Sequence, residues 1–210
     1  MITERDWTDA LISRYGEELH KRFSSATVAV CGLGGLGSNI ATALARSGIG
    51  KLLLIDFDCV DVTNLHRQQY KASQIGRYKA EALAENLLEI APYTKIHTMT
   101  VRITEENFAA LLKEADIVCE AFDHAESKAM LVNGVLEQLP HCYLVAASGM
   151  ASMNTPNTIR TRKIMKRFYL CGDEVSEAAD NVGLMAPRVM LCAAHQAHTV
   201  LRILAGEYDV

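Results

Sequence analysis

Three features are scarce in this sequence of 210 residues, and each scarcity excludes a class of protein. No run approaches the roughly 20 apolar residues that cross a bilayer as a helix. The first residues, MITERDWTDA, are acidic, unlike a secretory signal. Lys and Arg number 21 against 25 Asp and Glu, so a nucleic-acid-binding surface is not the expected main function. We expect a soluble, cytoplasmic protein whose partner is a small molecule or another protein.

Paired cysteines are also absent, because no C-x-x-C motif occurs. The six cysteines stand singly in mostly apolar stretches, at positions 31, 59, 119, 142, 171 and 192. A tetrahedral zinc site needs four ligands at close spacing, and a disulfide framework needs a denser pattern. We therefore expect reduced thiols and no zinc, with every cysteine other than Cys171 in the core. The histidines show no spacing typical of metal ligands either.

What the sequence does contain is a regular alternation of strands and helices. A leading amphipathic helix is predicted over 3–23. Strands follow at 27–31, 51–56, 95–101, 117–121 and 142–147, separated by helices at 36–46, 73–90, 104–113 and 124–138. The last part is predicted to contain an antiparallel strand pair at 158–164 and 167–171, an acidic loop at 172–180 and a closing helix at 187–204. Such alternation favours a mostly parallel sheet covered on both faces.

The chain length permits one sizeable core but not two full domains. We therefore predict a Rossmann-like, doubly wound α/β fold in a single domain, 1–210. Its parts are a leading helix (1–24), a nucleotide-binding α/β core (25–150), and a C-terminal region of strands, crossover loop and closing helix (151–210).

A glycine-rich turn lies between the first predicted strand and the helix that follows it. Gly32, Gly34 and Gly37 form a G-x-G-x-x-G motif, in which the backbone approaches a phosphate and helix N–H groups meet its charge. Asp56 ends the next strand, where a carboxylate accepts ribose hydroxyls. These features fit an NAD enzyme as well as other nucleotide-binding proteins. A purely structural glycine turn is the remaining alternative.

Polar residues after Asp56 favour a triphosphate. Asn64 and Arg67 stand three positions apart, so they share one face of a helical turn, and Lys79 follows on the next predicted helix. Cationic side chains neutralise phosphates and stabilise departing pyrophosphate, which a nicotinamide site does not require. The alternative is that both are ordinary solvated helix charges.

Asp123 follows the predicted strand 117–121, at the edge where open α/β sheets bind ligands. A carboxylate there could hold Mg²⁺ on nucleotide phosphates, because Mg²⁺ takes one or two carboxylates together with phosphate oxygens and water. Asp is also favoured as a helix N-cap, so a capping role is the alternative.

Together, the segments G-L-G-G-L-G-S, D-F-D and N-L-x-R-Q, with Lys79 and Asp123, resemble the ThiF/MoeB/HesA family, bacterial relatives of the ubiquitin-activating enzymes. The resemblance extends from about Ala26 to Gly206. The segment 181–187 and the helix after it look most like the short ThiF-type sulfur-carrier adenylyltransferases of thiamine biosynthesis.

This resemblance implies an enzyme that uses ATP to adenylate the C-terminal glycine carboxylate of a ubiquitin-like, ThiS-like sulfur carrier protein. Pyrophosphate leaves, and a sulfur donor protein acts next. Arg67 and Lys79 would contact the phosphates and Asp123 the Mg²⁺. The other implied ATP contacts are Gly32, Gly34, Gly35, Gly37, Asp56, Asp58, Asn64 and Gln68.

The resemblance further implies a homodimer, in which an arginine of the leading helix, Arg14 or Arg22, reaches an ATP site of the partner subunit. Cys171 is the candidate for sulfur handling, against the alternative of a small buried side chain. Three other functions stay open: adenylation of a non-protein carboxylate such as threonylcarbamoyl-adenosine in tRNA, an NAD-dependent oxidoreductase, and a nucleotide sensor without turnover.

Overall fold

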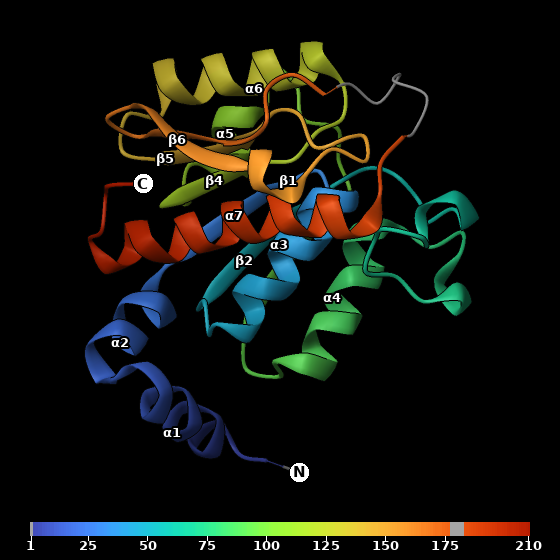
Figure 1. Ribbon diagram of the computed structural model, residues 1–210. Helices are drawn as coiled ribbons and strands as arrows, with labels where there is room; N and C mark the ends of the chain where they lie inside the picture. Colours follow the sequence, from blue (N-terminus) through green and yellow to red (C-terminus); the bar gives the residue numbers. More distant parts are fainter. Residues whose placement is uncertain (1, 177–182) are drawn as a thin grey trace.

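The computed structural model describes residues 2–176 and 183–210, and a seven-stranded sheet forms its centre (Figure 1). The strands are β1 (Thr27–Cys31), β2 (Lys51–Ile55), β3 (Lys95–Met99), β4 (Ile117–Glu120), β5 (Tyr143–Ala147), β6 (Arg160–Met165) and β7 (Phe168–Gly172). Their order across the sheet is β3-β2-β1-β4-β5-β7-β6. All neighbours are parallel except β6 and β7, so the predicted antiparallel pair is confirmed.

Helices cover both faces of this sheet. One face carries α3 (Gly35–Arg46), α4 (Lys79–Ile90) and α7 (Ala186–Ala205), and the other carries α5 (Phe108–Leu112) and α6 (Ala125–Gln138) (Figure 1). Side chains of β1 alternate between the two cores: Val28 and Val30 face α3 and α7, whereas Ala29 and Cys31 face the other layer. The predicted doubly wound α/β fold is confirmed.

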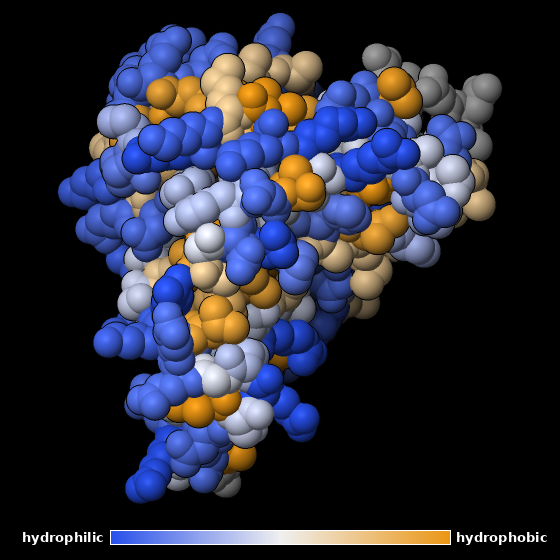
Figure 2. Space-filling view, turned by 60° about the vertical axis from the view of Figure 1, so that its left-hand side comes forward, coloured by the Kyte–Doolittle hydropathy of each residue, from blue (hydrophilic) through white to orange (hydrophobic). Residues whose placement is uncertain are grey.

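The leading helix differs from the prediction, because Gly16 divides it into α1 (Glu4–Tyr15) and α2 (Glu17–Ser25). Gly16 has φ +86°, which a right-handed helix does not accommodate. Leu11 packs on Gly48, and Tyr15 donates a hydrogen bond to the Ser47 carbonyl at 2.7 Å. The two helices extend from the body as a narrow arm (Figures 1 and 2).

Two predicted helices are also too long. Within 73–90, α4 starts only at Lys79, because Gly76 has φ +86° and a short 3₁₀ turn occupies 72–74. Within 104–113, α5 spans only Phe108–Leu112. The Asn107 side chain accepts the Thr104 N–H and donates to the Arg102 carbonyl, and these bonds hold the preceding segment as a turn outside the helix. Further 3₁₀ turns occupy 62–64 and 156–158. The predicted loop 172–180 lies partly outside the described residues.

No helix in the described part of the chain combines the length and apolarity that crossing a bilayer requires.

Candidate functional site

The glycine turn joins the carboxyl end of β1 to the first turn of α3. Gly32 has φ +88°, and a methyl group on Gly37 would lie 1.8 Å from the Gly32 carbonyl oxygen, so neither position tolerates a side chain. No side chain caps the N-terminus of α3 at Gly34. The N–H groups of its first turn are therefore available to an anion.

Asp56 connects this turn to the end of β2. Its carboxylate accepts hydrogen bonds from the Leu33 N–H at 2.6 Å and from the Asp58 N–H at 2.8 Å. The side chain is buried, and burial raises the pKa of this carboxyl group. Each oxygen keeps a second lone pair for a ligand. Asp56 thus fixes the glycine turn as well as offering acceptors beside it.

Arg67 lies directly over the first turn of α3. Its Cγ and Cδ lie 3.5 Å from the place where a Cβ on Gly35 would stand. Nη1 donates to the Thr63 carbonyl at 3.2 Å, whereas Nε is buried and no described residue bonds it. The Gln68 side chain lies beside Gly34, with Nε2 3.7 Å from the position of a Cβ there, and its Oε1 atom is likewise buried without a partner in the described chain. Because buried polar groups are normally satisfied, these two atoms indicate a ligand at the glycine turn.

Lys79 brings a second cation to the same region. Its side chain is 8% exposed, and Nζ donates to Asp58 at 2.9 Å. The Lys79 N–H also bonds the Asp58 carbonyl, so the start of α4 is tied to the segment after β2. The charge of Lys79 lowers the pKa of the Asp56 carboxyl group and so partly offsets the rise that burial causes. Removing this cation would leave two carboxylates close together.

Asn64 does not extend toward the glycine turn as Arg67 does. Its side-chain oxygen accepts the Asp61 N–H at 3.0 Å, which closes the 3₁₀ turn at 62–64. Its Nδ2 donors are not used in that contact.

Asp123 follows β4, its side chain is 89% exposed, and its carboxylate lies 3.8 Å from His124 Nε2. The N-cap of α6 is His124, so Asp123 is not the capping residue that the alternative interpretation proposed. The loop 121–124 lies against the glycine turn, because a Cβ on Gly32 would stand 2.9 Å from the Ala121 carbonyl oxygen. A free carboxylate at this position fits a Mg²⁺ ion, which needs few protein ligands when phosphates supply the rest.

Other predicted residues lie elsewhere. Arg22 donates to the Ala205 carbonyl at 2.8 Å and pairs with Glu18, which places it at the carboxyl end of α7. Arg14 is exposed on the projecting arm. Neither arginine joins the glycine turn of its own chain.

Cys171 is fully buried in β7, and burial raises the pKa of its thiol to about 11. This environment matches the small buried side chain of the alternative interpretation. The expectation of core cysteines fails for Cys59, which is exposed because the chain leaves the sheet after Asp56. Among residues 2–176 and 183–210, no three His, Cys, Asp or Glu side chains gather as metal ligands do.

Sequence inspection missed two ion pairs beside the site, one buried and one partly buried. Arg188, on the first turn of α7, pairs with Asp173 and donates to the carbonyls of residues 151, 154 and 155. Lys128 pairs with Glu120 at the end of β4. Each cation stands in a helix with many apolar residues, and a single charged side chain among apolar neighbours was the sequence signal for a partner within the fold.

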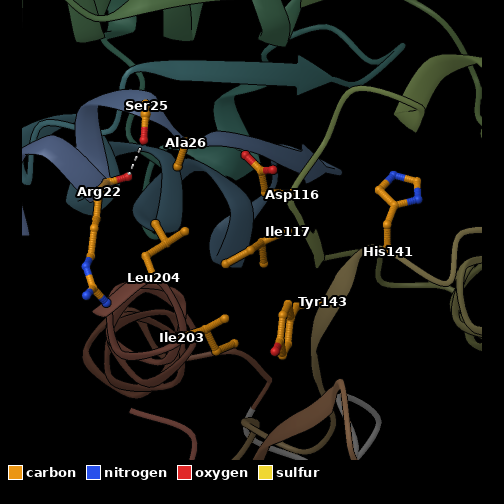
Figure 3. A pocket seen from close by; sticks show the side chains of 9 residues that line it. All are labelled: Arg22, Ser25, Ala26, Asp116, Ile117, His141, Tyr143, Ile203 and Leu204. Atoms are coloured by element: carbon orange, nitrogen blue, oxygen red, sulfur yellow. Dashed lines mark hydrogen bonds between the residues drawn. The ribbon is translucent and has the colours of Figure 1, made fainter. Parts of the chain in front are cut away.

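A cavity of about 360 Å³ lies at the opposite, amino edge of the sheet (Figure 3). Its lining includes Arg22, Asp116, His141 and Tyr143. Arg22 is engaged with α7, and Asp116 already accepts the Thr27 N–H at 2.8 Å. The glycine turn and the polar residues predicted around it lie at the carboxyl ends of the strands and do not line this cavity.

Comparison with known proteins agrees with this geometry. A model of the ThiF family matches residues 8–210. The sulfur carrier protein adenylyltransferase of Thermus thermophilus is 33% identical over 137 residues, covering 60% of this chain and 50% of that protein. The tRNA threonylcarbamoyladenosine dehydratase of Bacillus subtilis is 33% identical over 154 residues, covering 72% and 59%.

The chain spans about half the length of the curated relatives it matches. Among solved structures, it resembles the tRNA N6-threonylcarbamoyladenosine dehydratase of Escherichia coli, crystallised with ATP. The TM-score is 0.87 at 23% identity, covering 99% of this chain and 98% of that one. At that identity the likeness concerns the fold alone.

Proposed function

This chain belongs to the ThiF family, and from that premise we propose that it transfers the adenylyl group of ATP to a carboxylate. The observation that carries the proposal is the pair of buried, unbonded atoms at the glycine turn, Arg67 Nε and Gln68 Oε1. A donor and an acceptor beside free helix N–H groups suit a nucleotide phosphate and its neighbouring polar atoms. A bound nicotinamide cofactor would not require the cations that gather there.

In the proposed reaction, a carboxylate oxygen attacks the α-phosphorus of ATP. The new P–O bond forms as the bond to pyrophosphate breaks, giving an acyl-adenylate, and no protein nucleophile takes part. Arg67 and Lys79 supply positive charge where the leaving group becomes more negative. Asp123 would hold Mg²⁺, which neutralises phosphate charge when bound. The protein contributes positioning and electrostatic stabilisation.

We assign the carboxylate to the C-terminal glycine of a ubiquitin-like, ThiS-like sulfur carrier protein of thiamine biosynthesis. Support comes from the sulfur carrier protein adenylyltransferase among the relatives. Hydrosulfide released by a separate sulfur donor then attacks the acyl carbon, the bond to AMP breaks, and a thiocarboxylate and AMP result. Burial of Cys171 makes it unsuited to deliver that sulfur. A homodimer is proposed with this assignment, since the arm bearing Arg14 is free to approach a second copy.

One observation favours a tRNA substrate instead. The hairpin 160–167 contains five Lys or Arg among eight residues and no acidic residue, although the whole chain carries a net charge of −4. Tyr143 and Tyr208 stack beside it, with Arg167 5.9 Å from the Tyr143 ring centroid. Hydrophilic side chains form a band across the upper part of the surface in Figure 2. Basic and aromatic side chains together are typical of RNA-binding surfaces.

The experiment is carrier-dependent ATP–pyrophosphate exchange, measured with a panel of ubiquitin-like carriers ending in Gly-Gly and with threonylcarbamoylated tRNA. We expect exchange with one carrier, lost by about 100-fold in Arg67→Ala and in Asp123→Ala. The matched control is Arg77→Ala, which removes an exposed ion pair with Glu85. It should retain activity within about twofold, as surface ion pairs contribute little. Exchange with tRNA alone would favour the second substrate.

A further inference from the structure

Asp123 lies on a short loop, 121–124, which is held by an ion pair whose carboxylate is buried and whose ammonium group is partly buried. Glu120 ends β4 and is 1% exposed, and Lys128 stands on the second turn of α6. Lys128 Nζ donates to both carboxylate oxygens of Glu120, at 2.8 and 2.9 Å, and to the Phe122 carbonyl at 2.8 Å. A lysine ammonium has three donors, so no donor of Lys128 is left for a phosphate.

Glu120 and Lys128 together bind both backbone groups of Phe122, the central residue of the loop. Glu120 accepts the Phe122 N–H at 2.7 Å while Lys128 bonds the carbonyl of the same residue. The preceding residue, Ala121, donates to the Cys31 carbonyl at 2.9 Å, at the end of β1. Gln196 of α7 also bonds the Glu120 carbonyl at 3.0 Å. The loop is thus joined to β1 and α7.

The same loop contacts the glycine turn at Gly32. The Phe122 ring and the Ala121 carbonyl lie 3.0 and 2.9 Å from the position of a Cβ on Gly32. A shift of Phe122 would therefore move Asp123 on one side and Gly32 on the other. Two parts of the nucleotide site, the phosphate-binding turn and the metal-binding carboxylate, share this one support.

We propose that Glu120 and Lys128 are positioning residues that fix Asp123 at the distance from the glycine turn at which it can hold the metal of a bound Mg·ATP. This inference rests on the proposed function, which assigns Asp123 to that metal. A buried ion pair adds little net stability compared with a neutral pair of the same shape, so a geometric role explains its presence better. Burial raises the pKa of Glu120, and Lys128 opposes that effect.

The test is a double-mutant cycle between Lys128→Met and Asp123→Ala, read as the dissociation constant of ATP with and without Mg²⁺. We expect Lys128→Met to weaken Mg·ATP binding about tenfold, equal to about 1.4 kcal/mol. Binding of metal-free ATP should change less than about threefold, and Lys128→Met should have no further effect once Asp123 is Ala. Equal loss in both backgrounds, or with and without Mg²⁺, would overturn the proposal.

A variant that keeps the fold guards against simple destabilisation. Glu120→Gln combined with Lys128→Met leaves no unpaired buried charge, so its thermal midpoint should stay near that of the wild type. It should still show the loss of Mg·ATP affinity. Leu131→Ala, a core truncation on α6, should lower the thermal midpoint and leave the Mg²⁺ dependence of ATP affinity unchanged. If Leu131→Ala reproduces the Mg²⁺-specific loss, the pair has only a structural role.

Hydrogen exchange on the nucleotide-free protein gives a second readout. The amides of 121–124 should exchange faster in Lys128→Met, while those of β2 stay protected. Unchanged protection of 121–124 would contradict the inference. None of these measurements involves a carrier. A failure of carrier-dependent exchange would therefore overturn the proposed substrate and leave the role of Glu120 and Lys128 to be decided by Mg·ATP binding.

Discussion

At the scale of single residues, Gly35 and Gly37 have different tasks although they stand two positions apart. A Cβ on Gly37 meets a backbone oxygen at 1.8 Å, which cannot move without opening the turn. A Cβ on Gly35 meets the end of the Val189 side chain at 2.9 Å and Arg67 at 3.5 Å. Val189 is buried and β-branched, so it yields only by a small shift of the α7 packing, whereas Arg67 adjoins the ligand side of the turn. The second contact therefore affects both packing and the ligand site, but without the backbone clash at Gly37.

We therefore predict different outcomes for the two alanine substitutions. Gly37→Ala should lose about 3 kcal/mol of unfolding free energy, as forced overpacking does. Gly35→Ala should lose less, about 1 to 2 kcal/mol, because only a side chain must yield, and should bind ATP at least tenfold more weakly, a difference of about 1.4 kcal/mol. Urea unfolding and calorimetric ATP titration measure the two effects. Similar losses of unfolding free energy in both variants would show that Gly35, like Gly37, is required for the fold and not specifically for the ligand.

The thiols provide a second prediction at this scale. Cys59 is exposed, whereas the other five cysteines are buried, and burial raises the pKa of Cys142 and of Cys171 to about 11. Alkylation at about pH 8 should therefore modify one thiol rapidly, and Cys59→Ser should remove that reaction. Mass spectrometry counts the modified thiols. Rapid modification of Cys171 would contradict its buried position and reopen a sulfur-handling role.

How far single residues could be predicted from sequence depended on whether their partners are local. The glycine turn and Asp56 follow from a motif with its own geometry, and the structure brings them together. The exposure of Cys59 and the burial of Lys79 depend on how the irregular segment after β2 returns to α4. Nothing in neighbouring residues specifies that path.

At the scale of elements, α7 connects the sheet to the C-terminal hairpin through His195. Its Nδ1 lies 2.9 Å from the Thr161 hydroxyl of β6. Burial, and then His198, lowers the pKa of His195 below its ordinary value of 6.5. Folding thus favours the neutral imidazole. The resulting stabilisation is present above pH 6.5 and is lost as pH falls through that value toward the folded-state pKa.

We expect His195→Gln to reduce this dependence. Between about pH 7.5 and about pH 5.5, the urea midpoint of wild type should fall more than that of the variant, which lacks the contribution of His195 but keeps the other six histidines. His141→Gln, at an exposed position, serves as the control and should behave like wild type. An identical pH dependence in all three proteins would show that His195 does not couple α7 to β6.

Element boundaries were predicted well where apolar periodicity was continuous and poorly where glycine interrupted it. The buried strands β1, β2 and β4 agree closely with their predicted ranges. Gly16 and Gly76 adopt positive φ and break helices that periodicity alone extended through them. A glycine in a polar helix does not reveal its φ, because only the packing of the two flanking segments selects the left-handed conformation.

At the scale of the whole molecule, the sheet places the glycine turn and Asp123 together because β1 and β4 are neighbours although a long stretch of chain separates them. Order reverses at this pair, with β2 and β3 on one side and β4 and β5 on the other. Ligands of open α/β sheets bind at this reversal, at the carboxyl ends of the strands. The alternation of elements predicted the architecture, but the substrate depends on surfaces that the alternation does not describe.

The central claim is that the AMP portion of ATP becomes bonded to a carboxylate. The most direct measurement incubates the protein and a Gly-Gly carrier with ATP labelled either at the α- or at the γ-phosphate, and follows label on the carrier. If the carboxylate is adenylated, α-label moves to the carrier, γ-label leaves with pyrophosphate, and Arg67→Ala abolishes the transfer. Carrier labelled from γ-phosphate, or α-label released only as free nucleotide with every carrier and with threonylcarbamoylated tRNA, would contradict it.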